Sequence, residues 1–123
     1  MIEGPSGAGK SDLALRLIDR GALLVSDDRT RVTRDGERLL AHPPEEMAGR
    51  IEVRGLGMAT VARSDAAPVA LVVRLAGEDQ RLPERRARRI AGVTVREMAL
   101  DPFRASAPIK VEMALRDPEL PPA

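Results

Sequence analysis

The stretch Gly4-Pro5-Ser6-Gly7-Ala8-Gly9-Lys10-Ser11 decides the fold of this chain. It satisfies the phosphate-loop pattern G-x-x-x-x-G-K-[ST] at every position. Glycines allow successive backbone N–H groups to turn toward one anion, and a helix that begins at the loop points its positive end at the same anion. Lys10 can reach the β- and γ-phosphates of a nucleotide, and the Ser11 hydroxyl can ligate Mg²⁺. The loop is therefore predicted to bind nucleotide phosphates.

The sequence after the loop is the one that a phosphate loop requires, rather than that of an incidental glycine-rich turn. An amphipathic helix is expected over residues 12–20, and Gly21 is expected to end it. Leu23-Leu24-Val25 then reads as a short buried parallel strand. Only Met1, Ile2 and Glu3 precede the loop, which normally follows a full strand, so we expect the first strand to be truncated.

The remaining elements are short. We expect a single domain over residues 1–117 and a disordered tail over residues 118–123. Expected strands lie at residues 30–34, 38–41, 51–54, 58–62, 68–75 and 90–95, and further helices at residues 84–89 and 108–116. Asp35-Gly36 predicts the turn of a hairpin. The fold class is α/β, a P-loop-containing domain with a mixed β-sheet and flanking helices.

Composition excludes several classes of function. The 123 residues contain no Cys, Trp or Tyr and only one Phe and one His, so disulfides, thiolate nucleophiles, cysteine zinc sites and multi-histidine metal centres are excluded. His42 is expected to be a surface turn residue. A net charge of +1 and the scarcity of aromatic residues argue against nucleic-acid binding. No segment approaches the roughly 18 apolar residues of a membrane span, and we expect a cytoplasmic protein.

Two carboxylates directly follow the predicted strand at residues 23–25. In an open α/β sheet, ligands gather at the carboxyl ends of the strands, where Asp27 and Asp28 are placed. Phosphoryl transfer needs one carboxylate for the metal and one for the proton of the nucleophile. Adjacent strand residues point to opposite sides, so one aspartate can face the metal and the other the acceptor. The structural alternative is a pair of turn-forming aspartates before a hairpin.

Three segments of the chain resemble the catalytic domain of the HPr kinase/phosphorylase family. They are GPSGAGKSDLAL from Gly4, RGALLVSDDR from Arg20 and IEVRGLGMATV from Ile51, and the E-x-R-G-L-G pattern of the third is the most specific. The resemblance runs from Gly4 to about Val61 and is looser beyond. It implies a fold like that of HPr kinase and PEP carboxykinase.

The resemblance also implies an activity. Members of this family use ATP and Mg²⁺ (or Mn²⁺) to phosphorylate a serine of the phosphocarrier protein HPr. They reverse that step by phosphorolysis with inorganic phosphate, and so regulate the phosphotransferase system and carbon metabolism. The family assembles as hexamers, so a homo-oligomer is expected. It also carries a catalytic histidine upstream of the loop that has no counterpart here.

The resemblance implies roles for particular residues. Lys10 would hold and polarise the transferred phosphate. Asp28, eighteen residues later, would accept the seryl proton and return it in the reverse reaction. Arg54 would stabilise charge within the segment 51–60. Arg104 is the nearest counterpart of a downstream arginine that the family carries in a flexible basic loop.

A metal site is implied at Ser11 and Glu52, with Asp27 supporting the metal or its water shell. Glu52 and Arg54 are two residues apart on a predicted strand and should face the same side; the structural alternative is a cross-strand ion pair of little energetic worth. Two other functions fit the same loop. One is a small-molecule kinase or nucleotide hydrolase, and the other is a non-catalytic nucleotide-sensing module.

Overall fold

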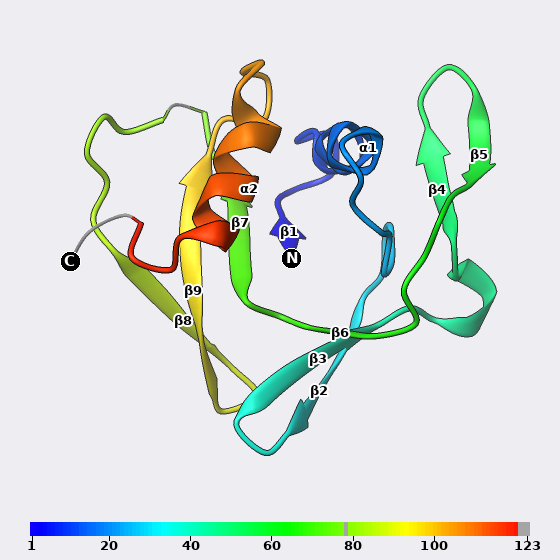
Figure 1. Cartoon of the computed structure of the whole chain (residues 1–123). Helices are drawn as coiled ribbons and strands as arrows, with labels where there is room; N and C mark the ends of the chain where they lie inside the picture. Colours follow the sequence, from blue (N-terminus) through cyan, green and yellow to red (C-terminus); the bar gives the residue numbers. More distant parts are fainter. Residues whose placement is uncertain (78, 121–123) are drawn as a thin grey trace.

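The computed structural model describes residues 1–77 and 79–120 (Figure 1). Its strands are β1 (Ile2–Glu3), β2 (Arg31–Asp35), β3 (Arg38–His42), β4 (Arg50–Val53), β5 (Gly57–Thr60), β6 (Ala67–Pro68), β7 (Leu71–Leu75), β8 (Arg86–Ile90) and β9 (Val93–Leu100). The helices are α1 (Lys10–Asp19) and α2 (Ala107–Arg116), with a 3₁₀ turn at Glu45–Met47. No helix within these residues is both long and apolar enough to cross a membrane.

The principal sheet has the strand order β1-β7-β9-β8. The pairs β1–β7 and β7–β9 are parallel. Strands β8 and β9 are antiparallel and are joined by a turn at Ala91 and Gly92, so the sheet is mixed as expected. A second sheet has the order β2-β3-β6, and a separate hairpin joins β4 to β5. The hairpin predicted at Asp35-Gly36 is confirmed, and the strands expected at residues 51–54 and 58–62 form as β4 and β5, which pair with each other.

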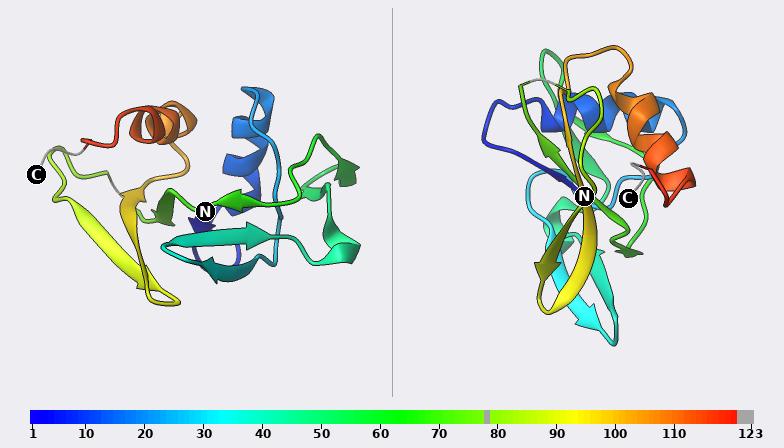
Figure 2. Two further views of the ribbon diagram at one scale, coloured as in Figure 1. Left: turned by 60° about the horizontal axis from the view of Figure 1, so that its bottom comes forward. Right: turned by 90° about the vertical axis from the view of Figure 1, so that its left-hand side faces the viewer.

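The core explains why β7 lies at the centre of the principal sheet. Leu71, Val73 and Leu75 alternate along the strand and pack on the side of the two helices, in a cluster completed by Leu13, Leu100, Ala107, Val111 and Ala114. Val72 points the other way and packs with Leu39, Val93 and Val95. Figure 2 shows α1 and α2 on the same side of the molecule, away from the hairpins β2–β3 and β8–β9.

Several sequence-based expectations about these elements are wrong. The arginine-rich segment expected to be helical at residues 84–89 is strand β8, because cross-strand pairing with β9 outweighs its local helix propensity. Residues 68–75 divide into β6 and β7, which pair in different sheets. His42 ends β3 instead of lying in a turn, and its Nε2 is 2.9 Å from the Thr33 hydroxyl.

The strand expected at Leu23-Leu24-Val25 is reduced to one parallel bridge between Leu24 and Arg63. Leu24 is buried, whereas Leu23 is 58% exposed, so only one residue of the apolar run enters the core. The Leu24 N–H donates to the Ala62 carbonyl at 3.1 Å, and the Ser64 N–H donates to the Leu24 carbonyl at 2.9 Å. This bridge fixes the start of the segment that carries the two aspartates.

Candidate phosphate-transfer site

The glycine-rich loop joins β1 to α1 in the conformation that its sequence predicts. The Ala8 N–H donates to the Pro5 carbonyl at 3.1 Å, which closes the first turn of the loop. Gly7 and Gly9 have φ values of 79° and 101°, a region that residues with a Cβ rarely adopt. Gly9 is the N-cap of α1, so the helix begins at Lys10, directly after the loop as expected, and its positive end faces the loop.

Gly4 is required for a different reason, which is close packing against the sheet. A Cβ at Gly4 would lie 3.2 Å from the Cβ atoms of both Ala8 and Leu75. The first residue of the loop therefore packs directly against Leu75, the last residue of β7.

The ammonium of Lys10 lies across the opening of the loop. Its Nζ donates to the Gly4 carbonyl at 2.6 Å and to the Pro5 carbonyl at 3.3 Å. These bonds hold one positive charge beside the loop amides, so cationic and N–H donors converge at the same place. Such a concavity favours a phosphate group.

Asp27 connects three segments that are distant in sequence. Its Oδ1 accepts a hydrogen bond from the Ser11 hydroxyl at 2.9 Å, and its Oδ2 accepts one from the Glu52 N–H at 2.9 Å. The start of α1, the aspartate pair and strand β4 are thereby joined by one carboxylate. Of the residues to which the resemblance assigns a metal, Ser11 and Asp27 are in side-chain contact, and Glu52 is joined to Asp27 through its backbone N–H.

The donor set at this place fits Mg²⁺. Hydroxyl and carboxylate oxygens are the hard ligands that Mg²⁺ takes. The Ser11 hydroxyl and the Asp27 carboxylate, which a hydrogen bond joins, supply one oxygen of each kind. Among the residues that the structure describes, no three His, Asp or Glu side chains form a metal cluster, so further ligands would be phosphate oxygens and water.

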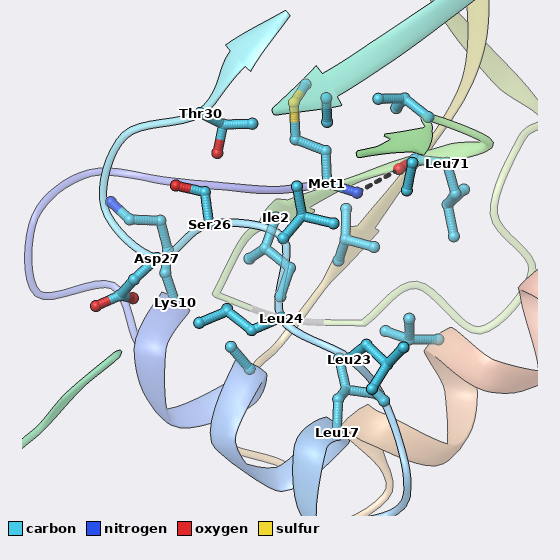
Figure 3. A pocket seen from close by; sticks show the side chains of 18 of the residues that line it. Met1, Ile2, Lys10, Leu17, Leu23, Leu24, Ser26, Asp27, Thr30 and Leu71 are labelled. Atoms are coloured by element: carbon cyan, nitrogen blue, oxygen red, sulfur yellow. Dashed lines mark hydrogen bonds between the residues drawn. The ribbon is translucent and has the colours of Figure 1, made fainter. Parts of the chain in front are cut away.

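Asp28 lies on the wall of a cavity of about 420 Å³ that begins at the loop. Polar residues line one end, where Lys10, Ser26, Asp27 and Thr30 are found (Figure 3). The rest of the wall is apolar and includes Leu17, Leu23, Leu24, Ile2 and Leu71. Asp28 is exposed, and residues 23–28 do not form a strand, so strand alternation does not explain how the two aspartates differ. Instead, the hydrogen bonds of Asp27 fix its orientation.

The two expected catalytic arginines lie in different surroundings. Strand β4 ends at Val53, and Arg54 is an exposed residue of the following turn, which the Leu56 N–H closes by donating to the Val53 carbonyl at 2.9 Å. Arg54 thus lies one residue beyond the strand on which it was expected to share a face with Glu52. Arg104 follows β9, and its Nε lies 3.6 Å from the Asp101 carboxylate. No hydrogen bond or ion pair among the described residues joins either arginine side chain to Lys10 or Asp28.

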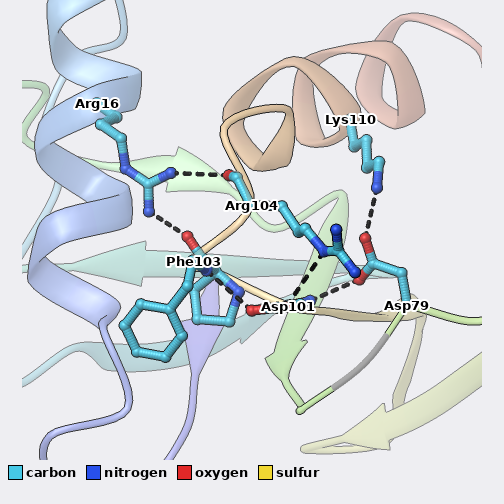
Figure 4. A network of polar contacts seen from close by, with 7 residues as sticks. Arg16, Asp79, Asp101, Phe103, Arg104 and Lys110 are labelled. Atoms are coloured by element: carbon cyan, nitrogen blue, oxygen red, sulfur yellow. Dashed lines mark hydrogen bonds and ion pairs between the residues drawn. The ribbon is translucent and has the colours of Figure 1, made fainter.

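The sequence did not indicate a polar network on the other side of the loop (Figure 4). Asp79 accepts hydrogen bonds from the Asp101 N–H, at 2.6 Å, and from the Lys110 ammonium. Burial raises the pKa of Asp79, but these two hydrogen bonds and the nearby positive charges outweigh it and lower the pKa below its ordinary value. The Asp101-Pro102 pair signals the end of a strand, but no local pattern pairs Asp101 with a residue 22 positions earlier.

Comparison with known proteins finds relatives of this chain by sequence and by structure. The model of the HPr Serine kinase C-terminal domain matches residues 1–101, well beyond the segments quoted above. The HPr kinase/phosphorylase of Enterococcus faecalis is 44% identical over 62 residues, which are 50% of this chain and 20% of that protein. That of Bordetella avium is 46% identical over 59 residues, 47% of this chain and 19% of that protein.

The chain spans about a fifth of the length of the curated relatives that it matches. A solved structure covers much more of it. The Hpr(Ser) kinase/phosphatase from Coxiella burnetii superposes with a TM-score of 0.83 at 28% identity, over 97% of this chain and 86% of that one. The expected α/β class, with a mixed sheet and flanking helices, is confirmed. The family model covers more than half of the residues, and the chain therefore belongs to the HPr Serine kinase C-terminal domain family.

Proposed function

We propose that this protein is a protein-serine kinase and phosphorylase that acts on HPr. It transfers the γ-phosphoryl group of ATP to a serine hydroxyl and removes it again with inorganic phosphate. The observation that carries the proposal is the position of Asp27, whose carboxylate joins Ser11 of the loop to the backbone of Glu52. The names of the relatives, HPr kinase/phosphorylase and Hpr(Ser) kinase/phosphatase, support the substrate and the two directions.

The loop and its lysine hold the transferred group. The backbone N–H groups of the loop, which Pro5 lacks, bind the phosphates from one side. The Lys10 ammonium can move from the Gly4 carbonyl to a phosphate oxygen, which is a stronger, charged acceptor. Ser11, Asp27 and Glu52 would hold Mg²⁺, which neutralises charge on the phosphate oxygens when bound. These oxygen ligands suit Mn²⁺ as well.

Asp28 moves the proton in both directions. When the seryl oxygen bonds to the γ-phosphorus, the bond to the β–γ bridging oxygen breaks, ADP leaves, and Asp28 takes the seryl proton. In the reverse step an oxygen of inorganic phosphate bonds to the phosphorus of the phosphoserine, and the bond from that phosphorus to the seryl oxygen breaks. Asp28 returns its proton to the seryl oxygen, and pyrophosphate is released. The same anion site serves both reactions, because free phosphate takes the place of the transferred group. The position of Asp28 on the cavity wall with Lys10 and Asp27 supports this role.

The proposal also gives roles to Arg54 and Arg104 and states the domain bounds, the location and the oligomeric state of the protein. Arg54 stabilises charge on the transferring group, for which its turn must close toward the loop. Arg104 takes part after leaving Asp101, with which it pairs at 3.6 Å. The domain comprises residues 1–117 and works in the cytoplasm, as a homo-oligomer.

Transfer of label from [γ-³²P]ATP to purified HPr tests the proposal. Labelling by the wild-type protein is expected to require Mg²⁺ and the acceptor serine, and to be lost in both Lys10→Ala and Asp28→Asn. For the reverse direction, phosphorylated HPr and inorganic phosphate should yield pyrophosphate. Labelling that persists in both variants would reject the proposed site.

The cavity of about 420 Å³ supports a second candidate, a small-molecule kinase or nucleotide hydrolase. Its volume is within the range of small-molecule sites, and its polar end lies at the two aspartates. This candidate predicts nucleotide turnover when HPr is absent. A non-catalytic nucleotide sensor instead predicts ATP binding by calorimetry with no product for any acceptor.

A further inference from the structure

Phe103 is the only aromatic residue of the chain, and its side chain is 75% exposed. The ring lies against the phosphate loop. A Cβ built on Gly9 would be 3.5 Å from the Cε1 and Cζ atoms of Phe103. An aromatic surface is thus presented to solvent at the point where the loop becomes helix α1.

The loop that carries Phe103 is fixed to α1. The guanidinium of Arg16 donates to the Arg104 carbonyl at 3.2 Å and to the Pro102 carbonyl, so it holds the backbone on either side of Phe103 (Figure 4). A hydrogen bond of 3.1 Å from the Arg16 Nε to the Asp12 carboxylate orients the guanidinium. Gly9 is the N-cap of α1 and Arg16 lies in its last turn, so the same helix positions both the phosphate loop and the backbone around Phe103.

The opposite side of the same loop is fixed as well. The Asp101 carboxylate accepts a hydrogen bond from the Phe103 N–H at 2.9 Å, and the Asp101 N–H donates to Asp79 at 2.6 Å. Pro102 is buried. A backbone anchored by this many polar contacts has no need of an exposed ring for its own stability, and a phenylalanine side chain left in water forgoes its burial energy.

We propose that Phe103 is the surface on which the base of the bound nucleotide stacks. The inference rests on the proposed function, because it requires the phosphates to bind at residues 4–11. In such loops the backbone N–H groups hold the α- and β-phosphates, so the ribose and base leave the loop near its junction with the helix, which is where the ring lies. Stacking depends on the face of the base and not on its hydrogen-bonding groups, so the site accepts both ATP and GTP. Purines have the larger ring area, so they should bind more tightly than pyrimidines.

A Phe103→Trp variant tests the position of the base directly. The chain has no Trp or Tyr, so the new indole would be the only strong fluorophore. Its emission should change saturably with ATP, ADP and GTP, and much less with inorganic tripolyphosphate, which occupies the loop without a base. Equal changes with ATP and tripolyphosphate would overturn the proposal.

Calorimetry on Phe103→Ala and Phe103→Leu provides the second measurement. The affinity for ATP should fall about 5- to 150-fold in Phe103→Ala, which corresponds to about 1–3 kcal/mol for one stacked base. The affinity for tripolyphosphate should not change. Phe103→Leu keeps apolar bulk against Gly9 but lacks the ring face, so it should resemble Phe103→Ala. Leu82→Ala, at another residue that is 87% exposed, is the control.

The outcomes separate the two proposals. If both variants weaken ATP and tripolyphosphate equally, or weaken neither, the stacking role is rejected while phosphate binding by the loop stands. If the wild-type protein binds neither compound, the proposed function fails and the stacking role fails with it. A thermal melt of each variant shows that it is folded.

Discussion

The carboxylate of Asp27 accepts a hydrogen bond from the hydroxyl of Ser11, with 2.9 Å between the two oxygens. Its second oxygen accepts the Glu52 N–H at the same distance. One side chain therefore sets the spacing between the phosphate loop and strand β4. A substitution at Asp27 is therefore expected to affect both the stability of the protein and the position of the phosphate loop relative to β4.

Replacing Asp27 by Ala should lower both the stability and the metal affinity of the protein. The Ser11 hydroxyl and the Glu52 N–H would lose their acceptor, and because both groups are partly open to water the loss should be about 1 kcal/mol. Urea unfolding would measure the loss. Mg²⁺-dependent binding of ATP should weaken at the same time, since one of the three proposed metal ligands is missing.

Asp28→Ala is the matched control for that variant. Asp28 is exposed and makes no hydrogen bond or ion pair with another described residue, so its loss should leave the urea midpoint unchanged while phosphoryl transfer stops. An Asp28→Ala protein as destabilised as Asp27→Ala would show that the two aspartates do not differ in the way proposed.

Gly9→Ala and Gly21→Ala should cost similar stability but differ in nucleotide binding. The two glycines have φ values of 101° and 107°, and alanine at either would be strained by about 1–2 kcal/mol. Gly9 is the last loop residue before Lys10, whereas Gly21 follows α1 at its far end. Calorimetry should show weaker ATP binding only in Gly9→Ala. Equal affinities in the two variants would mean that the conformation of the loop at Gly9 is not needed for binding.

Local signals in the sequence were sufficient for the loop and for the hairpins. The glycines at positions 7 and 9 have the positive φ values that curvature around an anion requires, and Asp35-Gly36 forms its predicted turn. Each of these features depends on residues adjacent in the chain. The resemblance of the segment from Ile51 then identified Glu52, whose backbone the structure joins to Asp27.

Long-range pairing accounts for what the sequence did not reveal. Residues 86–90 are rich in arginine, which favours a helix, but Arg88 forms ion pairs with Glu97 of β9 and with Glu3 of β1. Leu24 finds a single partner at Arg63, so the apolar run around it does not become a strand. The anchoring of Phe103 depends on Asp79, which lies 22 residues before Asp101. The periodicity of apolar residues and the spacing of motif residues along the sequence do not predict contacts between residues so far apart in the chain.

Leu13→Ala should be among the most destabilising substitutions in α1. Leu13 is fully buried between α1 and the residues of β7, and removing such a side chain costs about 2–5 kcal/mol because a cavity is left. Leu56→Ala, at an exposed residue of the β4–β5 turn, should change stability by less than about 0.5 kcal/mol. Urea unfolding of both variants measures the difference. Equal midpoints would mean that α1 does not pack on the sheet through Leu13.

Asp79 should make the stability of the protein depend on pH in the acid range. Its pKa is lowered in the folded protein, from an ordinary value of about 3.9, so the unfolded chain takes up a proton first as the pH falls. The contribution of Asp79 is therefore complete above about pH 5 and is lost progressively as the pH falls through 3.9 toward the folded pKa. At neutral pH, Asp79→Asn should be less stable than the wild type, because Lys110 loses its ion pair.

The difference in unfolding free energy between the wild type and Asp79→Asn isolates this contribution. The pKa of Glu112 is also lowered, by its hydrogen bond with Arg20. Its contribution to stability is the same in both proteins and is removed when one unfolding free energy is subtracted from the other. The difference should be constant from pH 7 to pH 5 and should shrink below pH 4. In a Lys110→Met background the pKa of Asp79 should rise, because a hydrogen bond and a positive charge that lower it are removed. The difference should then be smaller at neutral pH, and a difference that does not depend on pH in either background would contradict the ion pair.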